Sequence, residues 1–319
     1  MSPYRRSLPQ LADRNFITDG GLETTLIYHD GIDLPHFAAF VLLDRPGGEN
    51  ILHRYFSRYA EIGRAERVGV VLESATWRAN PDWAAKLGYG PDALADIQRR
   101  AIVQLLDVRE RYQTPETPIV VSGNLGPRGD GYRAEQRMSD DEAEDYHGPQ
   151  VRTFAATPAD MVAAFTMNYT DEAIGIARAA KASDMPVAIA FTVETDGRLP
   201  SGESLQQAID RVDEATGAHP AYYMINCAHP THFAEALDHR AGWTKRIHGL
   251  RANASRMSHA ELDDSETLDA GDPVDLGQRY RELMQRMPQI RIVGGCCGTD
   301  HRHVAAICEA CLPALPSAA

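Results

Sequence analysis

The feature that most constrains the fold of this chain is a repeated alternation of short apolar runs with longer amphipathic stretches. Eight runs of apolar and β-branched residues read as strands. Most are continuously apolar, which is typical of strands buried on both faces of a parallel sheet. The predicted strands cover residues 16–18, 68–76, 118–122, 160–166, 187–193, 222–226, 246–250 and 290–293.

The stretches between these strands carry apolar residues at helical spacing. The predicted helices cover residues 49–64, 92–112, 171–182, 203–215, 231–237, 273–287 and 301–311. Eight strands that alternate with helices predict an α/β fold, a parallel eight-stranded (β/α)8 TIM barrel. The alternative is a doubly wound open sheet, but no Gly-x-Gly-x-x-Gly pattern follows the first predicted strand.

Length and charge limit the domain organisation and the partners. The chain has 319 residues, 43% of them hydrophobic, and no Pro/Gly-rich linker, so residues 1–319 are expected to form a single barrel domain. A net charge of -13 disfavours binding to nucleic-acid phosphates. No apolar run approaches the ~18–20 residues of a membrane span. Because the first 15 residues lack the apolar stretch of a secretory signal, a cytoplasmic location is expected. No surface pattern predicts the oligomeric state.

Two polar segments exceed the minimal barrel. Residues 129–157 are expected to hold a loop and a helix, and residues 253–275 are acidic and rich in Ser and Asp. Both follow predicted strand ends, where barrels carry functional loops. Solvated insertion is the simpler interpretation of each.

The cysteines carry the chemical argument. Cys296 and Cys297 stand between glycines in Gly294-Gly295-Cys296-Cys297-Gly298, just after the eighth predicted strand, and Cys227 ends the sixth. In a barrel, strand ends share one mouth, so three thiols can converge there. The total of five cysteines is odd, which argues against a disulfide framework and toward metal or reactive thiols.

Three thiolates suit Zn²⁺, which prefers four tetrahedral ligands, and the remaining position would be open to substrate. A substrate thiol in that position would lose its proton and become a nucleophile. Its natural reaction is attack on a methyl group of a sulfonium or quaternary ammonium centre.

Other interpretations of the cysteines stay open. Cys227 can be a small buried apolar residue, and the vicinal pair can be core packing or a redox couple. Cys308 and Cys311 lie three apart in the last predicted helix, where they would pack on the barrel. The alternative for them is a four-cysteine site with Cys296 and Cys297.

Three motifs in order, Thr18-Asp19-Gly20-Gly21-Leu22-Glu23-Thr24, Asn226-Cys227 and the GGCCGT of residues 294–299, resemble the homocysteine S-methyltransferase family. The resemblance implies zinc-dependent transfer of a methyl group to the thiol of L-homocysteine, which gives methionine. The chain offers no cobalamin or folate module, so S-methylmethionine or S-adenosylmethionine is the expected small-molecule donor, with betaine less favoured.

The motif match also implies site residues. Cys227, Cys296 and Cys297 take the places of the zinc ligands and activate the substrate thiol. Asp19 takes the place of the contact to the substrate ammonium group, although it can also be a turn residue before two glycines. The other substrate contacts implied are Gly20, Gly21, Ser74, Thr76 and Asn124.

One position departs from the family pattern. Phe165 stands where a glutamate that also grips the substrate ammonium is expected, and Glu194 past the fifth strand is the proposed replacement. The departure keeps two alternatives open. One is a zinc-dependent methyltransferase of the same fold acting on another thiol or selenol. The other is a non-catalytic zinc- or thiol-binding protein.

Further residues near the predicted mouth have two interpretations each. Trp77 and Tyr132 can hold a cationic donor against an aromatic face or pack at the rim. His229 and His232 can orient a metal ligand or simply begin a helix.

Overall fold

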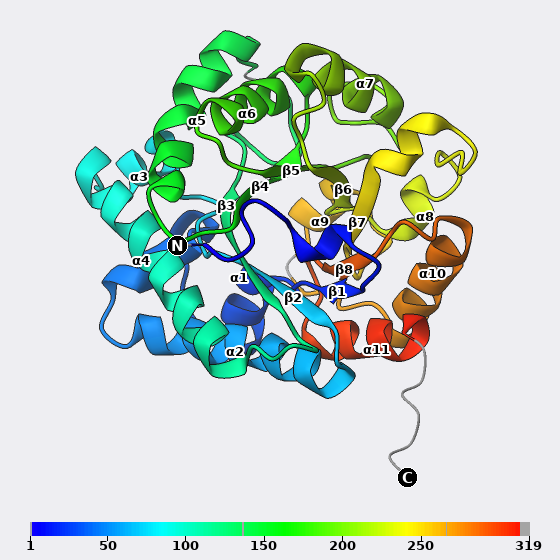
Figure 1. The fold of residues 1–319 in the computed structure, drawn as a ribbon, viewed down its shortest axis with the longest axis horizontal. Coiled ribbons are helices and arrows are strands. Elements are labelled where there is room, and N and C mark those ends of the chain that lie inside the picture. Colours follow the sequence, from blue (N-terminus) through cyan, green and yellow to red (C-terminus); the bar gives the residue numbers. More distant parts are fainter. Residues whose placement is uncertain (1, 136, 266, 313–319) are drawn as a thin grey trace.

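The computed structural model describes residues 2–135, 137–265 and 267–312, and its eight parallel strands close into a barrel in sequence order. Helices surround the barrel on its outside (Figure 1). The predicted (β/α)8 barrel is therefore confirmed. The strands are β1 (Phe16–Ile17), β2 (Gly69–Glu73), β3 (Ile119–Leu125), β4 (Met161–Met167), β5 (Val187–Phe191), β6 (Tyr222–Asn226), β7 (Ile247–Ala252) and β8 (Ile292–Gly295).

The helices follow the strands around the barrel. They are α1 (Leu22–Thr24), α2 (Gly48–Glu66), α3 (Pro81–Lys86), α4 (Pro91–Tyr112), α5 (Asp140–Ala155), α6 (Thr170–Ala182), α7 (Leu205–Thr216), α8 (Pro230–Phe233), α9 (His259–Asp263), α10 (Pro273–Arg286) and α11 (His301–Cys311). Short 3-10 or π turns lie at Pro9–Leu11, Thr25–His29, Pro35–Phe37, Ala39–Asp44 and Gly242–Arg246. Within the described part of the chain, no helix is long and apolar enough to cross a membrane.

Two predicted elements extend furthest beyond their observed bounds. The second strand ends at Glu73 rather than at residue 76, because Thr76 N–H turns back to the carbonyl of Ser74 at 2.7 Å. The helix predicted for residues 231–237 covers only Pro230–Phe233. The two polar segments hold α5 and α9, so the loop and helix expected in residues 129–157 are confirmed.

Strand alternation builds two apolar layers. On β4, Met161, Ala163 and Phe165 belong to the cluster inside the barrel, whereas Val162 and Ala164 belong to the layer between sheet and helices. The interior is thus packed with side chains rather than hollow, as in barrels of this size.

The amino-terminal segment closes one end of the barrel. Leu8 belongs to the interior cluster, and Gln10 Nε2 lies 3.1 Å from Met161 Sδ. Figure 1 shows this segment, in blue, crossing the barrel axis before β1. The carboxyl ends of the strands form the opposite end, and the predicted site residues lie there.

Candidate metal and substrate site

Cys227 enters the mouth through a left-handed turn. Residue 226 ends β6, and regular alternation would direct residue 227 away from the barrel interior. Its φ is 53°, a value that few non-glycine residues adopt, and its N–H donates to the carbonyl of Arg251 at 3.0 Å. This turn brings the Cys227 side chain into the wall of the mouth pocket.

Cys296 and Cys297 lie in a tight turn just beyond β8. The turn is closed by Thr299 N–H, which donates to the Cys296 carbonyl at 3.1 Å, and Gly298 has φ 79°. A Cβ atom on Gly21 would lie 2.6 Å from the Cys296 carbonyl, and one on Gly294 would lie 2.8 Å from the Asp19 carbonyl. These two positions require glycine because the ends of β1 and β8 approach so closely.

The three sulfur atoms form one cluster. Cys227, Cys296 and Cys297 each offer a sulfur, and these atoms lie within 4.8 Å of one another. Among the described residues no fourth histidine, cysteine or carboxylate joins the group. Asn226 Nδ2 donates to Cys227 Sγ at 3.2 Å, and the Tyr132 hydroxyl lies 3.3 Å from Cys297 Sγ. Burial raises the pKa of the Cys297 thiol, and the contact with Tyr132 opposes this shift. Three sulfur ligands fit a metal that prefers thiolates and leave one tetrahedral position open.

Cys227 and Cys296 are joined as a disulfide, with their Cα atoms 5.4 Å apart, and Cys297 is a free thiol. The sequence predicted three thiols at this place. The difference has a simple physical reason, because sulfurs close enough to share a metal are close enough to bond when oxidised. Metal binding by all three residues therefore requires the reduced protein.

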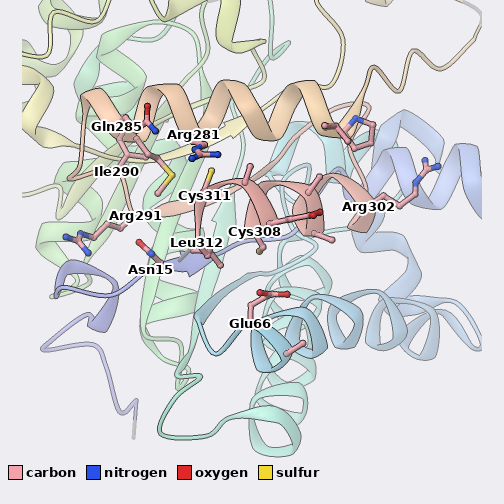
Figure 2. Close-up of a pocket in the computed structure, with 18 of the residues that line it drawn as sticks. Asn15, Glu66, Arg281, Gln285, Ile290, Arg291, Arg302, Cys308, Cys311 and Leu312 are labelled. Atoms are coloured by element: carbon pink, nitrogen blue, oxygen red, sulfur yellow. The ribbon is translucent and has the colours of Figure 1, made fainter. Parts of the chain in front are cut away.

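The four-cysteine alternative is wrong. Cys308 and Cys311 lie on α11 outside the barrel and do not join the cluster. Figure 2 shows Cys311 directed toward α10, where its sulfur lies 3.8 Å from the Gly277 carbonyl, and Cys308 directed toward α2. Burial raises the pKa of both thiols to about 12, which agrees with a packing role.

A cavity of about 350 Å³ lies over the sulfurs. Of the predicted substrate contacts, Asp19, Gly20, Gly21, Ser74 and Asn124 line it.

Two predicted contacts lie outside the cavity wall. Thr76 does not line it, since its hydroxyl donates to the Asn124 carbonyl at 2.7 Å. Glu194 is also absent from the lining, and its carboxylate faces His259 Nδ1 at 3.0 Å. The N–H of Gly21, another of the predicted substrate contacts, donates to the Thr299 carbonyl at 3.0 Å.

Asp19 faces Arg251, a residue that was not among the predicted site residues. Arg251 Nη2 lies 2.6 Å from Asp19 Oδ1, an ion-pair distance without good hydrogen-bond alignment, and Tyr55 donates to Oδ2 at 3.0 Å. Burial raises the pKa of Asp19, and Arg251 and Tyr55 oppose that shift. Arg251 directly follows the predicted seventh strand, but nothing in the sequence alone reveals its partner.

Phe165 lines the cavity, in agreement with its predicted place at the end of the fourth strand. Its ring lies under the Arg251 guanidinium, with Cζ 4.8 Å from the ring centre. The cavity wall thus has an aromatic face and a guanidinium at the place where a second carboxylate was expected.

Glu23 and Glu73 are among the further carboxyl-bearing residues that line the cavity. Burial raises the pKa of each to about 7. Glu73 Oε2 has no hydrogen-bond partner within the described part of the chain. Near neutral pH these groups therefore change between neutral and charged forms.

The acidic segment 253–275 covers the mouth. Seven of its described residues line the cavity: Ser255, Leu262, Asp263, Ser265, Thr267, Leu268 and Asp269. His259 of the same segment has Nε2 2.6 Å from the Cys227 carbonyl and stacks on Tyr132 at 3.9 Å. The segment is thus part of the site, and His259 supports both Cys227 and Tyr132.

The remaining predicted side chains have structural partners. His229 begins α8 and accepts from Thr231 N–H, and His232 Nε2 lies 2.9 Å from the Arg256 carbonyl. Trp77 lines the cavity, but Arg78 covers one face of its ring at 4.3 Å.

Comparison with known proteins identifies the class to which this barrel belongs. The family model described as homocysteine S-methyltransferase matches residues 16–311. The chain belongs to the homocysteine S-methyltransferase family, a family of methyl-transferring enzymes. No curated protein sequence matches the chain.

Among solved structures, the chain is similar to the homocysteine methyltransferase MmuM from Escherichia coli. The metallated form has a TM-score of 0.73 at 20% identity, covering 94% of this chain and 97% of that one. The oxidised form has a TM-score of 0.74 at 20% identity, covering 95% and 97%. This likeness independently supports the barrel fold.

Proposed function

We propose that the protein transfers a methyl group from a sulfonium donor, S-methylmethionine or S-adenosylmethionine, to the thiol of L-homocysteine. The observation that carries the proposal is the convergence of Cys227, Cys296 and Cys297 at the mouth of a barrel of this family. In the reaction, the homocysteine sulfur bonds to the methyl carbon. The donor's S–CH3 bond breaks, and its electron pair stays on the donor sulfur.

Three reduced cysteines provide a site for Zn²⁺, which when bound lowers the pKa of a substrate thiol and holds it as a thiolate. The chain's own groups prepare this site. Asn226 and Tyr132 place polar hydrogens beside the sulfurs, and His259 fixes the Cys227 carbonyl at 2.6 Å. Residues of the acidic segment 253–275 form part of the cavity wall above the sulfurs.

The reaction involves two small molecules. The thiol end of homocysteine is expected at the cysteines, and its amino-acid end among the polar groups of Asp19, Ser74 and Asn124, which line the same cavity. The donor then approaches from the open side of the mouth.

The test measures metal content and methionine formation on the same reduced protein. We expect about one zinc per chain and methionine production from homocysteine with S-methylmethionine or S-adenosylmethionine. Protein left oxidised should bind less metal, because the Cys227–Cys296 disulfide removes two of three ligands. Bound zinc without methyl transfer to any thiol would contradict the enzymatic proposal, and absence of metal after full reduction would contradict the metal site.

A further inference from the structure

Arg251 is a buried cation in the wall of the substrate cavity. It stands near the end of β7, in register with Asn226 and Gly294 of the neighbouring strands, and it is 7% exposed. Nε donates to the Gly295 carbonyl at 3.0 Å, and Nη2 donates to the Gly20 carbonyl at 3.2 Å. These bonds fix the plane of the guanidinium.

One nitrogen of this guanidinium is left over. Nε and Nη2 have acceptors, but no described residue accepts a hydrogen bond from Nη1 of Arg251. Nη1 of Arg251 is not shut off from solvent. Since Arg251 lines the cavity, Nη1 is the donor that it offers to a bound molecule.

The surroundings of Arg251 keep this donor in place. Asp19 balances its charge at 2.6 Å, and the Phe165 ring supports its face at 4.8 Å. The Tyr55 hydroxyl in turn donates a hydrogen bond to Asp19. The Asp19 carboxylate is therefore already engaged by two groups of the protein, whereas the Arg251 guanidinium has free capacity for an anion.

We propose that Arg251 binds the carboxylate of the thiol substrate, and that Asp19 positions Arg251 rather than holding the substrate ammonium group. This inference rests on the proposed function and specifies the substrate class as thiols that carry a carboxylate. A planar guanidinium held on three sides is well suited to such a group, because its N–H bonds form charge-assisted hydrogen bonds to carboxylate oxygens. The substrate's amino group then contributes less to recognition than its carboxylate.

The first experiment uses the unaltered, reduced and zinc-loaded protein with three thiols of matched length. Homocysteine carries both charged groups, 4-mercaptobutanoate lacks the ammonium, and 3-aminopropane-1-thiol lacks the carboxylate. We expect kcat/KM to fall less than about 10-fold for 4-mercaptobutanoate and roughly 10- to 100-fold for the aminothiol. The reverse order would overturn the inference.

The second experiment needs no turnover. Calorimetry measures the binding of methionine, 4-(methylthio)butanoate and 3-(methylthio)propylamine, which are the methylated forms of the three thiols. In Arg251→Gln, the two carboxylates should bind roughly 10- to 100-fold more weakly, with the amine unchanged. Arg251→Lys keeps the positive charge but loses the planar pair of N–H donors of the guanidinium. It should therefore bind the two carboxylates more tightly than Arg251→Gln but less tightly than the parent protein.

Arg246→Gln is the matched control. Arg246 also pairs with an aspartate, Asp213 at 2.8 Å, and lies over an aromatic ring, Tyr223 at 5.2 Å, but it does not line the cavity. Its substitution should leave all three affinities unchanged. The second arginine of the cavity wall, Arg78, lies between Trp77 and Trp83, and its guanidinium donates to the Gly129 carbonyl.

The outcomes separate this inference from the proposed function. Carboxylate-dependent binding through Arg251 without methyl transfer to any thiol would leave the inference standing and contradict the activity. Methylation of homocysteine, together with tighter binding of 3-(methylthio)propylamine than of 4-(methylthio)butanoate, would support the proposed activity and contradict the inference. Loss of carboxylate binding in Arg78→Gln but not in Arg251→Gln, or no binding of any of the three thioethers, would also overturn the inference.

Discussion

Substitution of Cys297 by serine is expected to remove bound zinc and to lower methyl transfer at least 100-fold. Cys297 is one of three sulfurs within 4.8 Å of one another, and no fourth metal-binding side chain joins them in the described ranges. A serine hydroxyl is a poor ligand for a metal that prefers thiolates. The loss should exceed the roughly 10- to 100-fold cost of removing an outer contact to a metal ligand. Metal analysis and initial rates on the reduced protein measure both effects.

Cys311→Ser is the matched control for this prediction. Cys311 is also a free cysteine, but it lies on α11 beside α10 and outside the sulfur cluster (Figure 2). We expect it to keep one zinc per chain and near-normal activity. Circular dichroism shows whether each variant is folded. A folded Cys297→Ser protein that keeps its zinc and its rate would rule out the three-sulfur site.

Much of the fold was predictable because barrel strands have a simple chemical signature. Buried parallel strands are apolar on both faces, so β5 and β6 were found within two residues of their bounds, with β6 matched at both ends. Strand ends were harder. Ser74 and Thr76 directly follow the apolar run of β2 and were included in the predicted strand. Their backbone instead leaves the sheet to form the mouth.

The sulfur cluster was predictable because each cysteine follows a strand, and all strands of a parallel barrel end at one mouth. The pairing of Asp19 with Arg251 was not, since these residues are 232 positions apart and neither has a local signal for the other. His259 was missed for a related reason. It lies in a polar segment that reads as a solvated insertion, and only the tertiary structure brings it to Cys227.

The cavity wall also makes stability depend on pH, and the largest effect of this kind is expected from Glu73→Gln. Glu73 is 3% exposed and its Oε2 has no partner in the described residues. Burial raises its pKa from 4.5 to about 7, with Arg251 opposing this shift. Because the folded state holds the proton more tightly, the stabilisation is complete below pH 4.5. It is lost as the pH rises to about 7.

Glutamine keeps the shape of the protonated acid and cannot ionise, so Glu73→Gln should be spared this loss. The shift corresponds to roughly 3 kcal/mol of unfolding free energy. The variant should therefore gain about that much unfolding free energy relative to the parent protein between pH 4.5 and pH 8, as measured by urea unfolding across this range.

Glu23, whose pKa is also raised to about 7, is present in both proteins, so its effect on the comparison cancels to first order. Glu214→Gln on the exposed side of α7 is the control and should follow the parent curve. Parallel curves for Glu73→Gln and the parent would show that the pKa of Glu73 is the same in the folded and unfolded states, and would contradict the raised pKa.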